Sequence, residues 1–177
     1  MMRIIAGQYK HRLLAFPKND PDLRPTKDMV KEALFSIIGA RVNGARFLDL
    51  YAGSGSIGLE AVSRGAREAV FVDQNTQFIR GNIQKLGCLN TRVYHSDVPR
   101  ALKSLAAKTE NFDIIFLDPP YRRGLLAVSA CFAILNPAGL LIAETAADYT
   151  PELPPEVKIR DERRYGSAKL LFLEKKN

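Results

Sequence analysis

Cysteine is scarce in this 177-residue chain, and long apolar runs are missing. Two cysteines, Cys88 and Cys131, are too few for a disulfide framework or a structural zinc site. No apolar stretch approaches the roughly 18 residues that a transmembrane helix requires, and the mean hydropathy is −0.12. The first residues carry a charge but no long apolar segment, so we expect no signal peptide. These absences favour a cytoplasmic globular protein with no metal site and no membrane partner.

Acidic residues are missing from the first 18 positions, which hold four basic residues. The whole chain has 26 Lys and Arg against 19 Asp and Glu, a formal net charge of +7. By segment, residues 1–46 carry +5, residues 47–157 carry −2 and residues 158–177 carry +4. A basic excess at the two ends favours a polyanionic partner, with nucleic acid ahead of a membrane surface.

Strand-like apolar segments alternate with segments of helical periodicity after residue 46. This alternation predicts an α/β fold, with a mostly parallel sheet and helices on both of its faces. The expected strands cover residues 47–50, 69–73, 91–95, 113–117 and 139–143, and the expected helices cover residues 26–38, 56–64, 76–86, 98–108 and 126–135.

The two ends of the chain read as hairpins. Residues 157–160 and 169–173 predict an antiparallel C-terminal hairpin that turns at residues 165–167. A short N-terminal β-hairpin is expected around residues 8–11, followed by a proline-rich loop. We therefore expect a basic N-terminal arm over residues 1–25 and one α/β domain over residues 26–177.

A glycine-rich turn follows the first expected strand and opens a helix. Gly53 and Gly55 permit a tight turn and a close approach to a ligand, and Gly58 lets the helix lie close to the sheet. The chain has no P-loop sequence, which excludes that class of nucleotide site. Asp73 ends the second strand about 20 residues further on, where a carboxylate can accept hydrogen bonds from both ribose hydroxyls.

Asp49 favours one of the two ligands that such a turn can bind. A carboxylate directly before the glycines would repel a pyrophosphate, whereas it suits the ammonium group of S-adenosylmethionine, directly or through water. Asp97, after the third strand, is expected to accept from the adenine amino group, and it also suits a helix N-cap. The expected cofactor-binding residues are Asp49, Tyr51, Ala52, Gly53, Ser54, Gly55, Asp73 and Asp97.

The sequence Asp118-Pro119-Pro120-Tyr121 follows the most apolar strand. The two prolines end the strand and fix the backbone at the edge where open α/β sheets bind ligands. The Asp118 carboxylate and the Pro119 carbonyl would accept both N–H groups of a purine amine and align it with a methyl donor. Tyr121 would stack on the extruded base. Glu144, by contrast, follows the last parallel strand, and we assign it no role beyond capping a turn.

This element and the glycine-rich turn together resemble the amino-group methyltransferases of nucleic acids. Further segments are similar to the bacterial 16S ribosomal RNA guanine-N2 methyltransferase family, and the similarity extends over the chain nearly from end to end. These segments are residues 3–7, 24–26, 30–35, 51–55, 58–65 and 122–124. The resemblance implies a Rossmann-like, seven-stranded methyltransferase fold, S-adenosylmethionine as donor and one guanine of the small-subunit RNA as acceptor. Two residues differ from the pattern of this family. Lys31 stands where arginine is common, and Asn75 stands where a second acidic residue often follows the ribose carboxylate.

The expected partner is 16S ribosomal RNA, naked or in an assembling small subunit, bound by a monomer. The basic arm is expected to contact RNA phosphates, whereas the predicted cofactor residues lie elsewhere in the chain. The alternative is that the arm only covers the structure beneath it. A DNA adenine-N6 methyltransferase and a non-catalytic RNA-binding module are the competing functions. The first normally needs a target-recognition domain, and an intact Asp-Pro-Pro-Tyr element argues against the second. The expected RNA contacts are Arg3, Lys10, Arg12, Arg24, Arg122 and Arg123.

Overall fold

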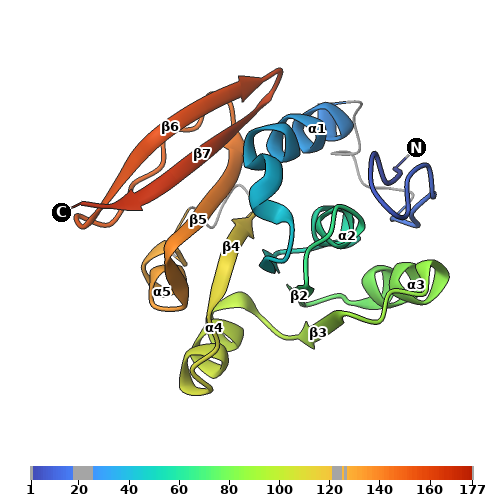
Figure 1. The fold of residues 1–177 in the computed structure, drawn as a ribbon. Coiled ribbons are helices and arrows are strands. Elements are labelled where there is room, and N and C mark those ends of the chain that lie inside the picture. The colour runs from blue at the N-terminus through green and yellow to red at the C-terminus, as the bar shows by residue number, and fades with distance from the viewer. Residues whose placement is uncertain (1, 18–25, 121–124, 126, 177) are drawn as a thin grey trace.

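The computed structural model describes residues 2–17, 26–120, 125 and 127–176. Seven strands form a sheet in the order β3-β2-β1-β4-β5-β7-β6. Strands β1 to β5 pair in parallel, whereas β7 pairs antiparallel with both β5 and β6 (Figure 1). The predicted mostly parallel sheet with an antiparallel C-terminal hairpin is confirmed.

The order of elements along the chain follows the predicted alternation. Among the described residues, no helix combines the length and apolar character needed to cross a membrane. The elements are α1 (Thr26–Ile38), η1 (Gly39–Val42), β1 (Arg46–Leu50), α2 (Ser56–Ser63), β2 (Glu68–Asp73), α3 (Gln77–Leu86), β3 (Thr91–His95), α4 (Val98–Ala107), β4 (Phe112–Leu117), α5 (Val128–Phe132), β5 (Leu135–Ala146), β6 (Val157–Tyr165) and β7 (Ala168–Lys175).

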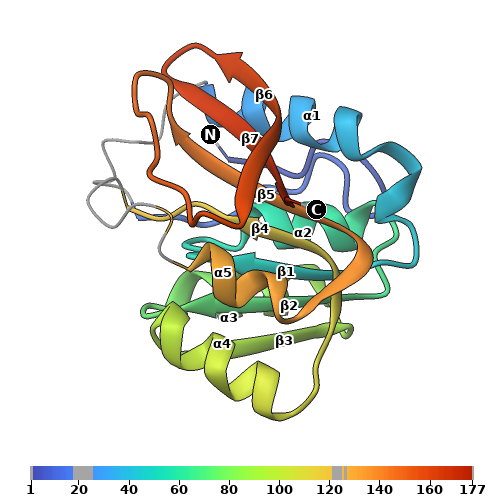
Figure 2. The ribbon, with the colours of Figure 1, turned by 90° about the vertical axis from the view of Figure 1, so that its left-hand side faces the viewer.

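Helices cover both faces of the sheet, as predicted (Figures 1 and 2). On one face, α4 and α5 bury Leu102 and Val128 against strand residues such as Leu117. On the other face, α1 packs over the centre of the sheet, and α2 and α3 pack over β1 and β2. Alternate residues of each central strand point to opposite faces, because the side-chain period of a strand is two. Because both faces are covered, the central strands are largely apolar, although β1 carries the buried Asp49 and β4 carries Asp113.

The segment after β4 differs from its prediction. A helix was expected over residues 126–135, but α5 covers only Val128–Phe132. Strand β5 begins at Leu135, which pairs with Phe112, and extends to Ala146. The helix ends early because residues 134 and 135 bond to the neighbouring strand instead: the Ile134 carbonyl accepts from the Phe112 N–H, and Leu135 pairs with Phe112.

The N-terminal arm, residues 2–17, forms a minimal hairpin. Arg3 and Leu13 make one antiparallel bridge, and Tyr9 lies in the turn between them. The arm packs beyond α2 and α3 (Figure 1), where it buries Ile4 and Leu14 in a cluster with residues of both helices. The boundary expected between residues 25 and 26 adjoins a stretch outside the described residues.

An ion-pair network lies at the edge of the sheet where β1 and β2 begin. The Arg92 guanidinium contacts Glu68 at 2.6 Å and Glu110 at 2.8 Å, and Arg46 pairs with the same two carboxylates. Hydrogen bonds from Arg92 and then Arg46 lower the pKa of Glu110 to about 2. The network ties β1, β2, β3 and the start of β4 together, at the end of these strands away from the candidate site.

Candidate active site

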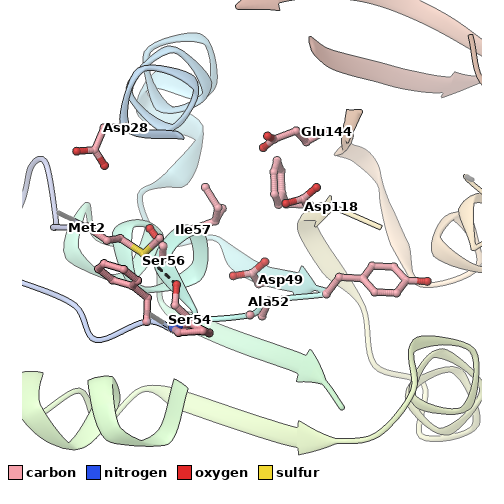
Figure 3. A pocket seen from close by; sticks show the side chains of 14 residues that line it. Met2, Asp28, Asp49, Ala52, Ser54, Ser56, Ile57, Asp118 and Glu144 are labelled. Carbon is pink, nitrogen blue, oxygen red and sulfur yellow. Dashed lines mark hydrogen bonds between the residues drawn. The ribbon is translucent and has the colours of Figure 1, made fainter. Parts of the chain in front are cut away.

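A pocket of about 240 Å³ opens at the carboxyl ends of β1, β4 and β5. It collects residues from the arm, from α1, from the turn after β1 and from the ends of β4 and β5 (Figure 3). This edge of the sheet, where the strand order reverses between β1 and β4, is where open α/β sheets bind ligands. The lining residues are Met2, Phe16, Pro17, Asp28, Asp49, Tyr51, Ala52, Gly53, Ser54, Ser56, Ile57, Phe116, Asp118 and Glu144.

The turn after β1 has the tight geometry that its glycines predict. Gly53 and Gly55 have φ values of 54° and 77°, in the left-handed region. Tyr51 adopts a φ of 60°, a conformation that is strained for a residue with a Cβ and recurs at functional sites. A Cβ on Gly58 would lie 2.3 Å from the Phe71 ring, so the predicted close approach of α2 to the sheet is confirmed.

Asp49 lies in the wall of the pocket on β1 and is only 2% exposed. Its Oδ2 accepts a hydrogen bond of 2.8 Å from the Gly58 N–H. Burial raises the pKa of Asp49 well above its usual value; the Gly58 hydrogen bond offsets this in part, and the charges of Asp118 and Asp73 add to it. A positively charged ligand group at this point would therefore favour the ionised carboxylate.

Asp73 stabilises the glycine-rich turn. Its Oδ2 accepts from the Gly53 N–H and its Oδ1 from the Asn75 N–H, both at 2.8 Å. A carboxylate has about four lone-pair sites, so these two bonds leave acceptor capacity for ribose hydroxyls. The ribose contact stays a prediction, because Asp73 does not line the described pocket.

Asp97 caps α4, as one of its two predicted roles required. Its Oδ1 accepts a hydrogen bond of 2.9 Å from the Arg100 N–H, and its backbone is extended, as is typical of an N-cap. Asp97, like Asp73, is not among the residues that line the described pocket. The contact to an adenine amino group stays a prediction.

Asp118 meets the turn after β1 across the pocket. The Asp118 N–H donates to the Leu50 carbonyl at 3.3 Å, which keeps the start of the Asp-Pro-Pro-Tyr element beside the end of β1. Pro119 is buried and Pro120 is exposed. Four predicted residues, Tyr121, Arg24, Arg122 and Arg123, lie outside the described residues.

Two carboxylates that the sequence did not assign to the site also line the pocket. Asp28 belongs to the first turn of α1, and Glu144 lies in β5 near Asp118 (Figure 3). The expectation that Glu144 follows the strand and caps a turn is wrong, because β5 continues to Ala146. In the described part of the chain, no group of three or more His, Cys, Asp or Glu side chains is arranged to hold a metal ion.

The arm forms part of the pocket, although the predicted cofactor residues lie elsewhere in the chain. Met2, Phe16 and Pro17 all line it. The Ser54 hydroxyl contacts the Met2 sulfur at 3.0 Å, so the arm touches the glycine-rich turn directly. The predicted RNA contacts Arg3, Lys10 and Arg12 are exposed on the same arm.

Buried polar side chains hold the arm in place. Glu60, fully buried on α2, accepts hydrogen bonds from the Ile5 and Ala6 N–H groups and from Arg64. Lys31 of α1 is 1% exposed; its Nζ donates to the Arg3 carbonyl at 2.5 Å and lies 3.7 Å from Glu60. Burial lowers the pKa of Lys31, although Glu60 opposes the shift.

Asn82 of α3 joins the arm to the glycine-rich turn. Its Oδ1 accepts from the Ala15 N–H at 2.7 Å, and its Nδ2 donates to the carbonyls of Ala15 and Ser54, each at 2.9 Å. Asn82 is fully buried, so its amide is held by these three partners. One side chain therefore fixes the arm and the turn relative to each other.

The sheet order, the glycine-rich turn and the Asp-Pro-Pro element together define a Rossmann-like methyltransferase fold. The solved Escherichia coli protein described as "Putative methyltransferase yhhF" superimposes with a TM-score of 0.82 at 33% identity, over 98% of this chain and 97% of that one. A 16S rRNA N2 methyltransferase of T. thermophilus, solved with AdoMet and guanosine, gives a TM-score of 0.66 at 25% identity, over 90% of this chain and 45% of that one.

The family model described as "Conserved hypothetical protein 95" matches residues 2–174. The Bacillus subtilis protein named "Putative rRNA methyltransferase YlbH" is 39% identical over 164 residues, which is 88% of each chain. Ribosomal RNA small subunit methyltransferase D of Escherichia coli is 42% identical over 128 residues, 71% of this chain and 63% of that protein. The chain belongs to this family of bacterial small-subunit rRNA methyltransferases.

Proposed function

We propose that this protein transfers the methyl group of S-adenosylmethionine to the 2-amino group of a guanine in 16S ribosomal RNA. The observation that carries the proposal is that Asp118 lines the same pocket as the glycine-rich turn. One pocket thus brings together the predicted amine acceptor and the predicted cofactor loop. The names of the relatives and the T. thermophilus complex with guanosine support the substrate class.

The charges of the pocket suit this methyl donor. S-adenosylmethionine has a net positive charge, from a sulfonium and an ammonium group against one carboxylate, and four carboxylates line the pocket: Asp28, Asp49, Asp118 and Glu144. A cation near the buried Asp49 would offset the desolvation that raises the pKa of that carboxyl. A pyrophosphate would meet repulsion from the same groups, which disfavours a nicotinamide dinucleotide.

The Asp-Pro element has the acceptors that the chemistry requires. The lone pair of a guanine 2-amino group is delocalised into the ring, so the nitrogen is a poor nucleophile. Acceptance of its two N–H groups by the Asp118 carboxylate and the Pro119 carbonyl would fix its direction and favour pyramidalisation. As the N–C bond forms and the S–C bond breaks, the nitrogen passes one proton along its hydrogen bond to the Asp118 carboxylate.

The proposal extends to the setting of the reaction. The protein would act as a monomer in the cytoplasm, with residues 1–25 as an RNA-binding arm on a methyltransferase domain of residues 26–177. The exposed Arg3, Lys10 and Arg12 support the arm's contact with phosphates.

The test offers three substrates to the purified protein with a labelled methyl donor: naked 16S RNA, assembled small subunits and duplex DNA. Nucleosides are then separated and identified. N2-methylguanosine from either form of the ribosomal RNA supports the proposal, and the comparison shows which form is preferred. N6-methyladenosine from DNA would assign the competing DNA activity, and no labelled product would favour a non-catalytic module.

A further inference from the structure

The pocket has two sides, which the strand order separates. The turn after β1, on one side, is the predicted cofactor loop, and β4 and β5 lie on the other side. Glu144 belongs to the β4–β5 side with Asp118 (Figure 3). This inference rests on the proposed function, under which the target base binds next to Asp118. A side chain on the β4–β5 side then lies next to that base.

The register of the sheet places Glu144 level with Asp118. Leu117 of β4 pairs with Ala143 of β5, and each of the two carboxylates follows directly. Neighbouring strands lie about 4.8 Å apart. Leu117 and Ala143 face the cluster under α4 and α5, so the alternation of side chains directs Asp118 and Glu144 to the opposite face. Two acceptor groups therefore line the pocket next to each other.

The Watson–Crick edge of guanine has two neighbouring donors, the N1–H and the 2-amino group. Adenine instead presents an N1 acceptor, whose lone pair would face a carboxylate. We propose that Glu144 accepts the N1–H of the target guanine while Asp118 holds the 2-amino group, so that Glu144 selects guanine. Enzymes that act on an extruded base recognise it by hydrogen bonds to this edge.

The test compares guanine with 2-aminopurine at the position that the wild-type protein methylates. The analogue keeps the 2-amino group, but its N1 carries no hydrogen. Each base is introduced into the RNA by splinted ligation, and kcat/KM for methylation is measured. Loss of one hydrogen bond to a charged acceptor predicts that wild type prefers guanine by roughly 10- to 100-fold.

Glu144→Ala should lower kcat/KM for guanine and should raise kcat/KM for 2-aminopurine or leave it unchanged, because the N1 lone pair no longer faces a carboxylate, so that the preference falls to within about threefold. Glu144→Gln, which keeps a neutral acceptor of the same size, should retain an intermediate preference. Asp28→Ala is the matched control, because it removes a pocket carboxylate that lies on α1, and it should keep the wild-type preference.

Three outcomes overturn the inference. An equal loss on both bases in Glu144→Ala would mean a merely structural role. A raised KM for S-adenosylmethionine with the preference intact would assign Glu144 to the cofactor. If Glu144→Ala does not fold, Glu144→Gln decides: a folded Glu144→Gln that prefers guanine over 2-aminopurine as strongly as wild type does contradicts the inference. A wild-type protein that never methylates guanine refutes the proposed function instead, and the two failures are distinguishable.

Discussion

Asn82 connects the N-terminal arm to the glycine-rich turn, and Asn82→Ala would break that connection without removing any residue that lines the pocket. The substitution leaves the buried Ser54 carbonyl without its partner, which costs about 1–3 kcal/mol. The two bonds to Ala15 contribute about 0.5–1.5 kcal/mol each, because Ala15 is exposed and water can replace them. The expected loss is about 2–6 kcal/mol of unfolding free energy.

For a chain of this size, that loss should lower Tm by roughly 4–24 °C. Affinity for S-adenosylmethionine should fall by about fivefold or more, since the arm and the turn would no longer be held in one arrangement before binding. Thermal melting and isothermal titration calorimetry at a temperature where the variant is folded measure the two effects separately.

Asn90→Ala is the matched control. The Asn90 side chain also donates two hydrogen bonds to backbone carbonyls, of Ala66 and Arg67, but it is exposed and does not touch the arm. Its loss should lower Tm by less and leave cofactor affinity unchanged. If Asn82→Ala binds S-adenosylmethionine as tightly as wild type, the arm does not shape the cofactor site, and this reasoning is refuted.

Asp73→Ala should weaken S-adenosylmethionine binding by about 1.5–3 kcal/mol, the range for a charge-assisted hydrogen bond, and unchanged affinity in calorimetry would exclude Asp73 as the ribose ligand. Neutralising Lys10 and Arg12 should flatten the log–log salt dependence of RNA affinity by roughly 0.7–0.9 for each phosphate that the arm no longer neutralises. An unaltered slope in a folded double mutant would remove the arm from the RNA-binding surface. Glu110, with its pKa lowered to about 2, stabilises the folded state above its usual pKa and loses that effect as pH falls toward 2. Glu110→Gln should therefore be less stable than wild type at pH 7 and similar to it near pH 2 in denaturant titrations.

The elements that follow from local sequence patterns could be predicted. The alternation of strands and helices, the turn after β1 and the C-terminal hairpin agree with the structure. The role of Gly58 could be predicted because a glycine at this place in a strand–turn–helix unit lets the helix lie close to the sheet. The short distance from Gly58 to the Phe71 ring agrees with that role. The helix expected over residues 126–135 was too long, because residues 134 and 135 bond to Phe112, a contact between distant segments that apolar periodicity does not reveal.

The polar residues that position the site depend on contacts between distant segments. Asn82 bonds to Ala15, 67 residues away, and Glu60 bonds to Ile5, 55 residues away. A polar residue on the apolar face of a helix, such as Asn82 three positions after Ile79, is the one local signal of such a role. Glu144 gave no such signal, because its place in the pocket follows from the pairing of β4 with β5.

The most direct test of the central claim compares wild type with Asp118→Ala on 16S RNA and small subunits, with N2-methylguanosine quantified by mass spectrometry. Wild type should form this nucleoside. Asp118→Ala should form it at least about a hundredfold more slowly, as for a lost preorganised acceptor, while its affinity for S-adenosylmethionine stays within a few-fold. A different methylated nucleoside from wild type, or an undiminished rate in folded Asp118→Ala, would contradict the account.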